Sequence, residues 1–289
     1  MPRIVYVAFL GLLLHSAPIS AEGPPTGAGT YENLVVLLDD FVAWRDPRGE
    51  QPRQIIRDTA GQPIEPVPDY GPESIAERLA GLEALQARLE DMNVAAWPRD
   101  RQVDWLAVRS RLDQQAFLLR IQRPWARDPG FYVDQMLRVT FTDLPVAGDA
   151  EASLLARLRA VPVLVAEAQE TLDDVAADYA DLAIFNLSNS DGVGHGYPYR
   201  AEPPAGVLGW YDDLLERAAA QPELLADIAA AREAVQAFDA WLQAKRPGWT
   251  ASAGVGEAAF DWYLRHVKLM PWTSAELVVL GQRELDRLW

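Results

Sequence analysis

The sequence predicts an all-α protein built as an irregular array of helices, and three observations support this fold class. Apolar residues recur at helical spacing through most of the chain after Tyr31. The alternating pattern of a half-buried strand is nearly absent, with residues 139–142 as at most a short exception. No repeat with a period of about 20 to 50 residues is found, which argues against a solenoid. With 289 residues, 49% of them hydrophobic, the chain can bury a substantial core in one large or two modest domains.

Residues 1–21 have the three parts of a secretory signal peptide. Arg3 gives the positive start, Ile4 to Leu14 form an apolar segment, and small residues near Ala21 supply a cleavage site. The apolar segment is well short of the ~20 residues that span a bilayer, so a membrane anchor is the weaker alternative. The chain has no cysteine, which excludes a lipid-modified cysteine and a disulfide framework. We therefore expect a periplasmic or secreted protein with no membrane attachment after signal cleavage.

Residues 22–30 are predicted to form a flexible leader, and residues 31–289 a helical domain. The first helix has an apolar stripe at helical spacing. Its predicted core residues are Leu34, Leu37, Leu38 and Phe41. Residues 46–72 contain six prolines, which predict an extended loop rather than a helix or a central strand.

Two further helices are predicted between residues 73 and 124. The apolar face of the first is Ile75, Leu79, Leu82 and Leu89, and that of the second is Trp105, Val108, Leu112, Ala116 and Leu119. Asp100 is the predicted N-cap of the second helix, and Pro124 ends it. Because the connection between them is short, we expect the two helices to pack antiparallel.

The longest helical signal starts at Asp149 and continues to Val175. Pro162 lies inside it, where a proline removes a backbone hydrogen bond, so we expect a kink there that helps to line a cleft. Residues 186–205 form a long loop rich in glycine and proline. Helices follow, with core faces at Leu224, Ile228, Val235, Phe238 and Leu242 and then at Phe260, Leu264 and Val267.

The last helix of the sequence has a well-defined start. Thr273 and Glu276 form a T-x-x-E capping box after Pro271. The predicted apolar face of this helix is Leu277, Leu280, Leu285 and Leu288. No glycine, asparagine or proline stop signal follows, and Trp289 is a large aromatic residue without a local partner. We expect that a continuation of the chain would complete this helix.

Composition and motifs argue against several function classes. The formal net charge is −16, and the basic residues are scattered singly, so a nucleic-acid-binding surface is not expected. No H-E-x-x-H motif, nucleophile elbow, Walker loop or dinucleotide fingerprint is found. A composite zinc site from His195, His266 and a carboxylate is less favoured than structural or surface roles for both histidines. We expect no metal ligand, no catalytic residue and no cofactor in this chain.

The loop from Gly192 to Arg200 carries the candidate binding residues. These are His195, Tyr197, Tyr199 and Arg200. A turn-rich backbone with these side chains suits the recognition of a peptide or a carboxylate, so we assign them to substrate binding. The alternative is an ordered structural loop in which the tyrosines are half buried and the glycines serve turns. Trp105, Trp241 and Trp262 lie within helical apolar patterns, so a core role is favoured over stacking on sugars.

Four stretches, in this order and spacing, resemble one bacterial family, the domain of unknown function 885. They are Arg123 to Tyr132, Leu158 to Pro162, Phe238 to Leu242, and Thr273 to Leu277 with Leu280-Gly281. The resemblance covers residues 31–289. It implies a zinc metallopeptidase of the gluzincin type, with zinc activating water, a glutamate as general base and a peptide as substrate. The family's H-E-x-x-P-G-H segment belongs to a later part of such proteins and is not found here, so zinc is expected only in a complete member.

Two functional hypotheses follow. The first is the N-terminal part of an exported metallopeptidase-like protein, which forms one wall of a peptide-binding cleft and is inactive alone. Such a part should expose the apolar face of residues 274–289 and bind hydrophobic dyes. The alternative is a complete, non-catalytic helical protein that binds peptides or a partner chain and melts cooperatively as a monomer. Its oligomeric state is not determined by the sequence.

Overall fold

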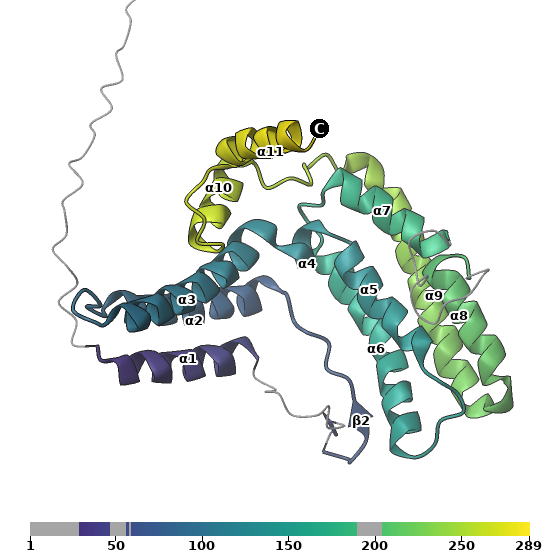
Figure 1. Ribbon diagram of the computed structural model, residues 1–289. Helices are drawn as coiled ribbons and strands as arrows, with labels where there is room; N and C mark the ends of the chain where they lie inside the picture. The colour runs from purple at the N-terminus through teal and green to yellow at the C-terminus, as the bar shows by residue number, and fades with distance from the viewer. Residues whose placement is uncertain (1–28, 47–55, 58, 190–203) are drawn as a thin grey trace, which may run out of the picture.

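The computed structural model describes residues 29–46, 56, 57, 59–189 and 204–289. The described part is an irregular array of helices with two short strands, which confirms the all-α prediction (Figure 1). The first elements are α1 (Tyr31–Arg45), β1 (Ile56–Arg57), β2 (Pro63–Ile64), α2 (Pro72–Glu90), α3 (Arg99–Phe117), the π-helix η1 (Leu118–Gln122), α4 (Pro124–Arg127) and α5 (Gly130–Arg138). They are followed by the 3₁₀-helix η2 (Val139–Phe141), α6 (Asp149–Thr171), α7 (Ala177–Ser188), α8 (Gly206–Arg217), the 3₁₀-helix η3 (Ala218–Ala220), α9 (Pro222–Lys245), the 3₁₀-helix η4 (Arg246–Gly248), α10 (Glu257–His266) and α11 (Ser274–Leu288).

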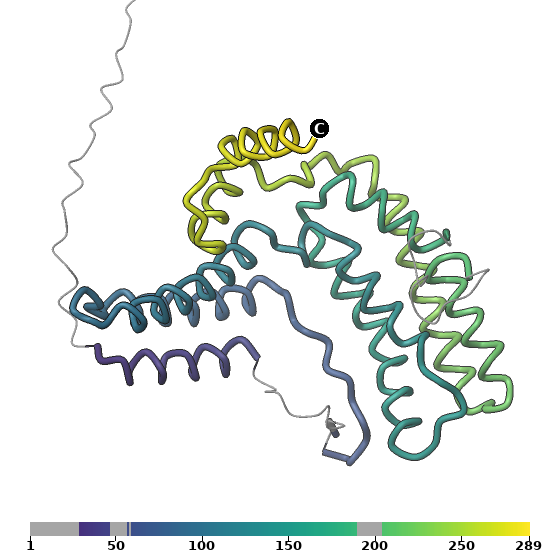
Figure 2. The backbone as a smooth tube through the Cα atoms, in the orientation of Figure 1, coloured from purple at the N-terminus to yellow at the C-terminus, as the bar shows by residue number. Residues whose placement is uncertain are grey.

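Helices α1, α2 and α3 form the first group (Figures 1 and 2). The core side of α1 consists of Leu34, Leu37 and Phe41, as predicted. Leu38 was expected in this core, but it is exposed. Successive residues of a helix point about 100° apart. Leu37 points toward α2 and α3, so Leu38 points away from them. The predicted apolar face of α3 is buried at Val108, Leu112 and Ala116.

The ends of α3 differ from the sequence-based expectation. Pro98 occupies the N-cap position, so Asp100 lies in the first helical turn instead of capping the helix. An aspartate in the first turn is favourable because the helix dipole is positive there. At the other end, α3 continues as a π-helix, and Arg123 then adopts a left-handed conformation with φ 40°. Pro124 thus begins α4 as well as ending the preceding helix.

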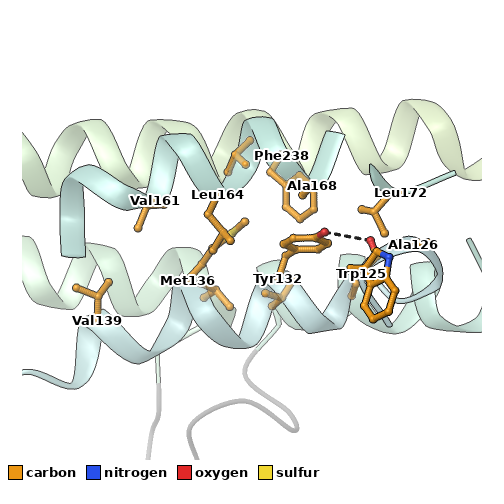
Figure 3. Packing of buried hydrophobic residues seen from close by; sticks show 14 of the residues in the cluster. Trp125, Ala126, Tyr132, Met136, Val139, Val161, Leu164, Ala168, Leu172 and Phe238 are labelled. Carbon is orange, nitrogen blue, oxygen red and sulfur yellow. Dashed lines mark hydrogen bonds between the residues drawn. The ribbon is translucent and has the colours of Figure 1, made fainter. Parts of the chain in front are cut away.

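Helices α4 to α9 form the second group, and α5 and α6 run antiparallel within it (Figure 3). The side chains between them are buried; Tyr132, Met136, Leu164, Ala168 and Phe238 meet there. Residues 139–141 continue from α5 as a 3₁₀-helix, so the weak strand signal at residues 139–142 does not give a strand. The Tyr132 hydroxyl, at the buried end of its ring, donates to the Trp125 carbonyl, 3.1 Å away.

Helix α6 starts at Asp149 as predicted and continues through Pro162 to Thr171. Because proline has no N–H, the Leu158 carbonyl loses its usual intrahelical donor. Val175 lies beyond the end of α6 but is buried. The buried face of α6 packs against α9. All five residues predicted for the core face of α9 are buried.

The loop that was predicted from residue 186 begins later. Residues 186–188 still belong to α7, because the helical hydrogen bonds continue to Asn189, whose N–H donates to the Phe185 carbonyl at 2.9 Å. Beyond α9, the chain returns to the first group, where α10 packs against α3 and α11 follows it (Figure 2). Leu264 of α10 and Val267, directly after α10, are buried as predicted, whereas Phe260 is exposed.

Candidate functional site

The four residues assigned to substrate binding from the sequence lie outside the described residues. His195, Tyr197, Tyr199 and Arg200 all fall between residues 189 and 204. The described ends of this segment are close together: a Cβ atom on Gly206 would lie 2.6 Å from the carbonyl carbon of Leu187. The start of α8 therefore packs directly on the end of α7. Substrate binding by the four residues stays a prediction.

His266, considered above for a composite zinc site, is engaged in packing. Its ring stacks on Trp262, with ring centroids 4.8 Å apart, and its Nδ1 lies 3.8 Å from Oδ2 of Asp113. Burial raises the pKa of Asp113, while Arg109 and His266 oppose that shift. Within the described ranges, no three histidine, aspartate or glutamate side chains gather as metal ligands. His266 therefore helps to attach α10 to α3.

The contact of α3 with α10 leaves an aromatic hollow at the surface. Phe117 and Trp262 stack with centroids 6.1 Å apart and nearly parallel planes. The hollow beside them has a volume of about 270 Å³. It is lined by Ala116, Phe117, Arg120, Ile121, Ala259 and Trp262. Trp262 was assigned to the core from its sequence pattern, but it is partly exposed at this hollow.

Helix α11 adds a second apolar hollow. Its capping box forms as predicted, with the Thr273 N–H donating to Oε2 of Glu276 at 2.7 Å. The hollow, of about 370 Å³, is lined by Trp272, Ala275, Glu276, Val279 and Leu280. Val278 is 71% exposed and Val279 60% exposed. Of the leucines predicted for the apolar face of α11, Leu285 and Leu288 are exposed, whereas Leu277 and Leu280 are partly buried. Much of the apolar surface of α11 is therefore uncovered in the described part of the chain.

Hydrogen bonds in the turn between α10 and α11 fix the orientation of α11 relative to α10 and α3. The Ser274 N–H donates to Oδ1 of Asp261 at 2.7 Å, and hydrogen bonds from Ser274 lower the pKa of that carboxyl group. Leu269 takes a left-handed conformation, with φ 54°, where the chain turns between the helices. The hydroxyl of Ser110 on α3 donates to the carbonyl of Val267 at 2.8 Å. We define residues 259–289 with the end of α3 as the α10–α11 surface.

The family profile for a bacterial protein of unknown function, DUF885, matches residues 58–289. The chain belongs to the DUF885 family. A solved structure from Shewanella oneidensis, described as a "putative lipoprotein of unknown function", is similar to this DUF885 protein with a TM-score of 0.59 and 16% sequence identity. The match covers 90% of this chain and 46% of that chain, so the DUF885 protein spans less than half the length of its neighbour. At this identity the likeness shows the fold alone. No curated protein matches the chain.

Sequence reasoning found one part of the α10–α11 surface and missed the other. The capping box and the leucine spacing of α11 are local signals, and both were readable. The hollow beside Phe117 was missed, because it depends on how α10 returns to α3 after more than a hundred residues. Phe260 and Trp262 carry apolar periodicity, and periodicity does not distinguish a core face from an uncovered one.

Proposed function

We propose that residues 31–289 act as the N-terminal helical part of a larger, exported protein of the DUF885 family, and that the α10–α11 surface packs against the rest of that protein. The observation that carries the proposal is the uncovered apolar side of α11, with Val278 and Val279 largely exposed. Exposed apolar patches with adjoining hollows mark interaction surfaces. The neighbour's chain is more than twice as long as the matched region, which supports a covering portion of the same polypeptide.

The resemblance to gluzincin-type peptidases extends the proposal to a role. The helical array would form one wall of a peptide-binding cleft, and the catalytic segment would belong to the later portion of the protein. The described residues do not fit a zinc site, since they offer no set of three suitable ligands and His266 is held by Trp262 and Asp113. We therefore assign no catalytic step to any described residue, and we propose that the chain is inactive alone.

Export to the periplasm or the medium is part of the proposal. The Shewanella neighbour is described as a lipoprotein, which is in keeping with export. Among the described helices, none is long and apolar enough to cross a membrane. Fractionation of cells that express the full chain tests the location, and recovery in the cytoplasm with residues 1–21 uncleaved would contradict it.

The surface is tested by hydrophobic dye binding and self-association of the purified chain. We expect strong fluorescence enhancement of 1-anilinonaphthalene-8-sulfonate, which Val279→Glu reduces several-fold. Val163→Glu is the matched control, because Val163 is similarly exposed at 57% but lies on α6. A monomer that melts cooperatively and does not bind the dye would instead support the complete, non-catalytic protein. If the purified chain bound one zinc ion tightly per molecule, the proposal that the zinc site belongs to the later portion of the protein would be overturned.

A further inference from the structure

An extended segment crosses the face of α5 and α6 and is anchored at both ends. We call residues 63–70 the strap. At its start, β2 pairs with β1, and Nη2 of Arg57 lies 2.6 Å from Oδ1 of Asp149 at the beginning of α6. At its end, the Tyr70 N–H donates to Oε1 of Glu167 at 2.8 Å, near the other end of α6. The strap therefore runs along much of α6.

The middle of the strap spans a cavity instead of filling it. The cavity has a volume of about 230 Å³, well above the ~10–15 Å³ that a single water molecule needs. Pro66 and Pro68 flank Val67 there, and proline rings restrict the strap to an extended path. The floor is apolar and consists of Val139, Val161 and Leu164. The space suits a small ligand with an apolar body.

Two arginines gather at one end of this cavity. Because α5 and α6 are antiparallel, Val139 lies at the same end as Val161 (Figure 3). Arg138 adjoins Val139 and Arg157 precedes Val161 by one turn, so both arginines line the same end. Arg157 is oriented by its Nη2, which donates to the Thr142 hydroxyl at 3.2 Å. Within the described residues, Arg138 forms no ion pair.

The charges of the lining favour an anion. Glu65 is the one acidic residue among those that line the cavity. Two guanidinium groups and one carboxylate line the cavity, in a protein whose net charge is −16. Guanidinium groups bind carboxylates through charge-assisted hydrogen bonds. Gln135 adds a further polar group on the α5 side.

We propose that this cavity binds a small carboxylate with an apolar body. The carboxylate group contacts Arg138 and Arg157, and the apolar body lies on Val161 and Leu164 beneath the strap. The proposal does not depend on the α10–α11 surface or on any other portion of the protein. It assigns a binding site, with no catalytic residue.

The probe pair is N-acetyl-L-leucine and its uncharged amide, N-acetyl-L-leucinamide, measured by calorimetry on the full chain. The acid is expected to bind with a dissociation constant of about 1 mM, and the amide about tenfold more weakly. Arg138→Gln is expected to weaken binding of the acid about tenfold. Arg283→Gln is the matched control, because Arg283 is exposed on α11 and makes the same change in net charge.

Two further variants separate charge from shape. Glu65→Gln removes the repulsive carboxylate and should tighten binding of the acid without affecting the amide. Ala160→Leu projects into the cavity from α6 and should abolish binding of both probes, provided that its circular dichroism spectrum is native. Equal affinity for acid and amide, an unchanged affinity in Arg138→Gln, or no binding at about 10 mM acid would each overturn the proposal. None of these results bears on dye binding by α11.

Discussion

Replacing Tyr211 with phenylalanine is expected to lower the free energy of unfolding by about 1–2 kcal/mol. Tyr211 lies on α8, is 0% exposed, and donates its hydroxyl hydrogen to the Met136 carbonyl at 2.8 Å. Met136 belongs to the last turn of α5, where carbonyl groups lack the usual intrahelical donors. The variant keeps the aromatic ring and removes a buried donor, so the loss reports on this one hydrogen bond between α8 and α5.

The magnitude follows from two opposing terms. Leaving the buried Met136 carbonyl without its donor costs about 1–3 kcal/mol. Part of this cost is offset, because phenylalanine has no hydroxyl group that must be removed from water on folding. For a protein of this size, each kcal/mol lowers the melting temperature by about 2–4 °C, so we expect a decrease of about 2–8 °C. Burial raises the pKa of Tyr211 far above its usual range, so the hydroxyl remains a donor and the effect should not vary between about pH 5 and pH 9.

Urea and thermal unfolding, followed by circular dichroism, measure the effect. Tyr31→Phe is the matched control, because the Tyr31 hydroxyl also makes a 2.8 Å hydrogen bond, to Asp104, but on the exposed surface. We expect that control to change stability by no more than about 0.5 kcal/mol. Equal losses in the two variants, or none in Tyr211→Phe, would refute the claim that this buried hydrogen bond joins α8 to α5.

Two further predictions concern a buried charge and a close backbone contact. Burial raises the pKa of Asp113, so the folded protein holds the proton more tightly than the unfolded chain, and the wild-type protein loses stability as pH rises from about 3.9 through the folded-state pKa. The free energy of unfolding of Asp113→Asn, measured relative to the wild type in urea titrations, should therefore be higher at pH 7 than at pH 3. The opposite trend would contradict the burial effect. Gly206→Ala combines φ 67° with a clash against Leu187 and should destabilise the protein by more than about 2 kcal/mol in thermal unfolding. Gly148→Ala, with φ 59° but open space around it, should cost less because only its backbone conformation is strained, and equal costs would show that the clash at Gly206 relaxes.

The helices and their main core faces could be predicted, because each depends on neighbours within one or two turns. The capping box of Thr273 and the start of α6 at Asp149 are signals of this kind. The errors arose where two local signals compete, as at Asp100, where Pro98 took the cap position. They also arose where exposure depends on distant partners, as at Leu38 and Phe260.

The candidate sites were less accessible to sequence reasoning. The apolar face of α11 was predicted, since residues on one helix face recur at a fixed spacing. The cavity beneath the strap was not predicted, because its lining comes from three separate segments of the chain. The prolines near Val67 indicated an extended segment, but nothing in their pattern states which helices that segment crosses.

The sequence by itself determined the all-α class, the helix starts with strong caps, the proline-rich extended segment and the family. These properties follow from local backbone preferences and from short motifs in a fixed order. Only the tertiary structure decided that α10 returns to α3, where an aromatic hollow forms beside Phe117, and that the strap places Arg138 and Arg157 at one end of a cavity. The physical reason is that side-chain periodicity specifies which face of a helix is apolar, whereas the packing of distant elements specifies what, if anything, covers that face.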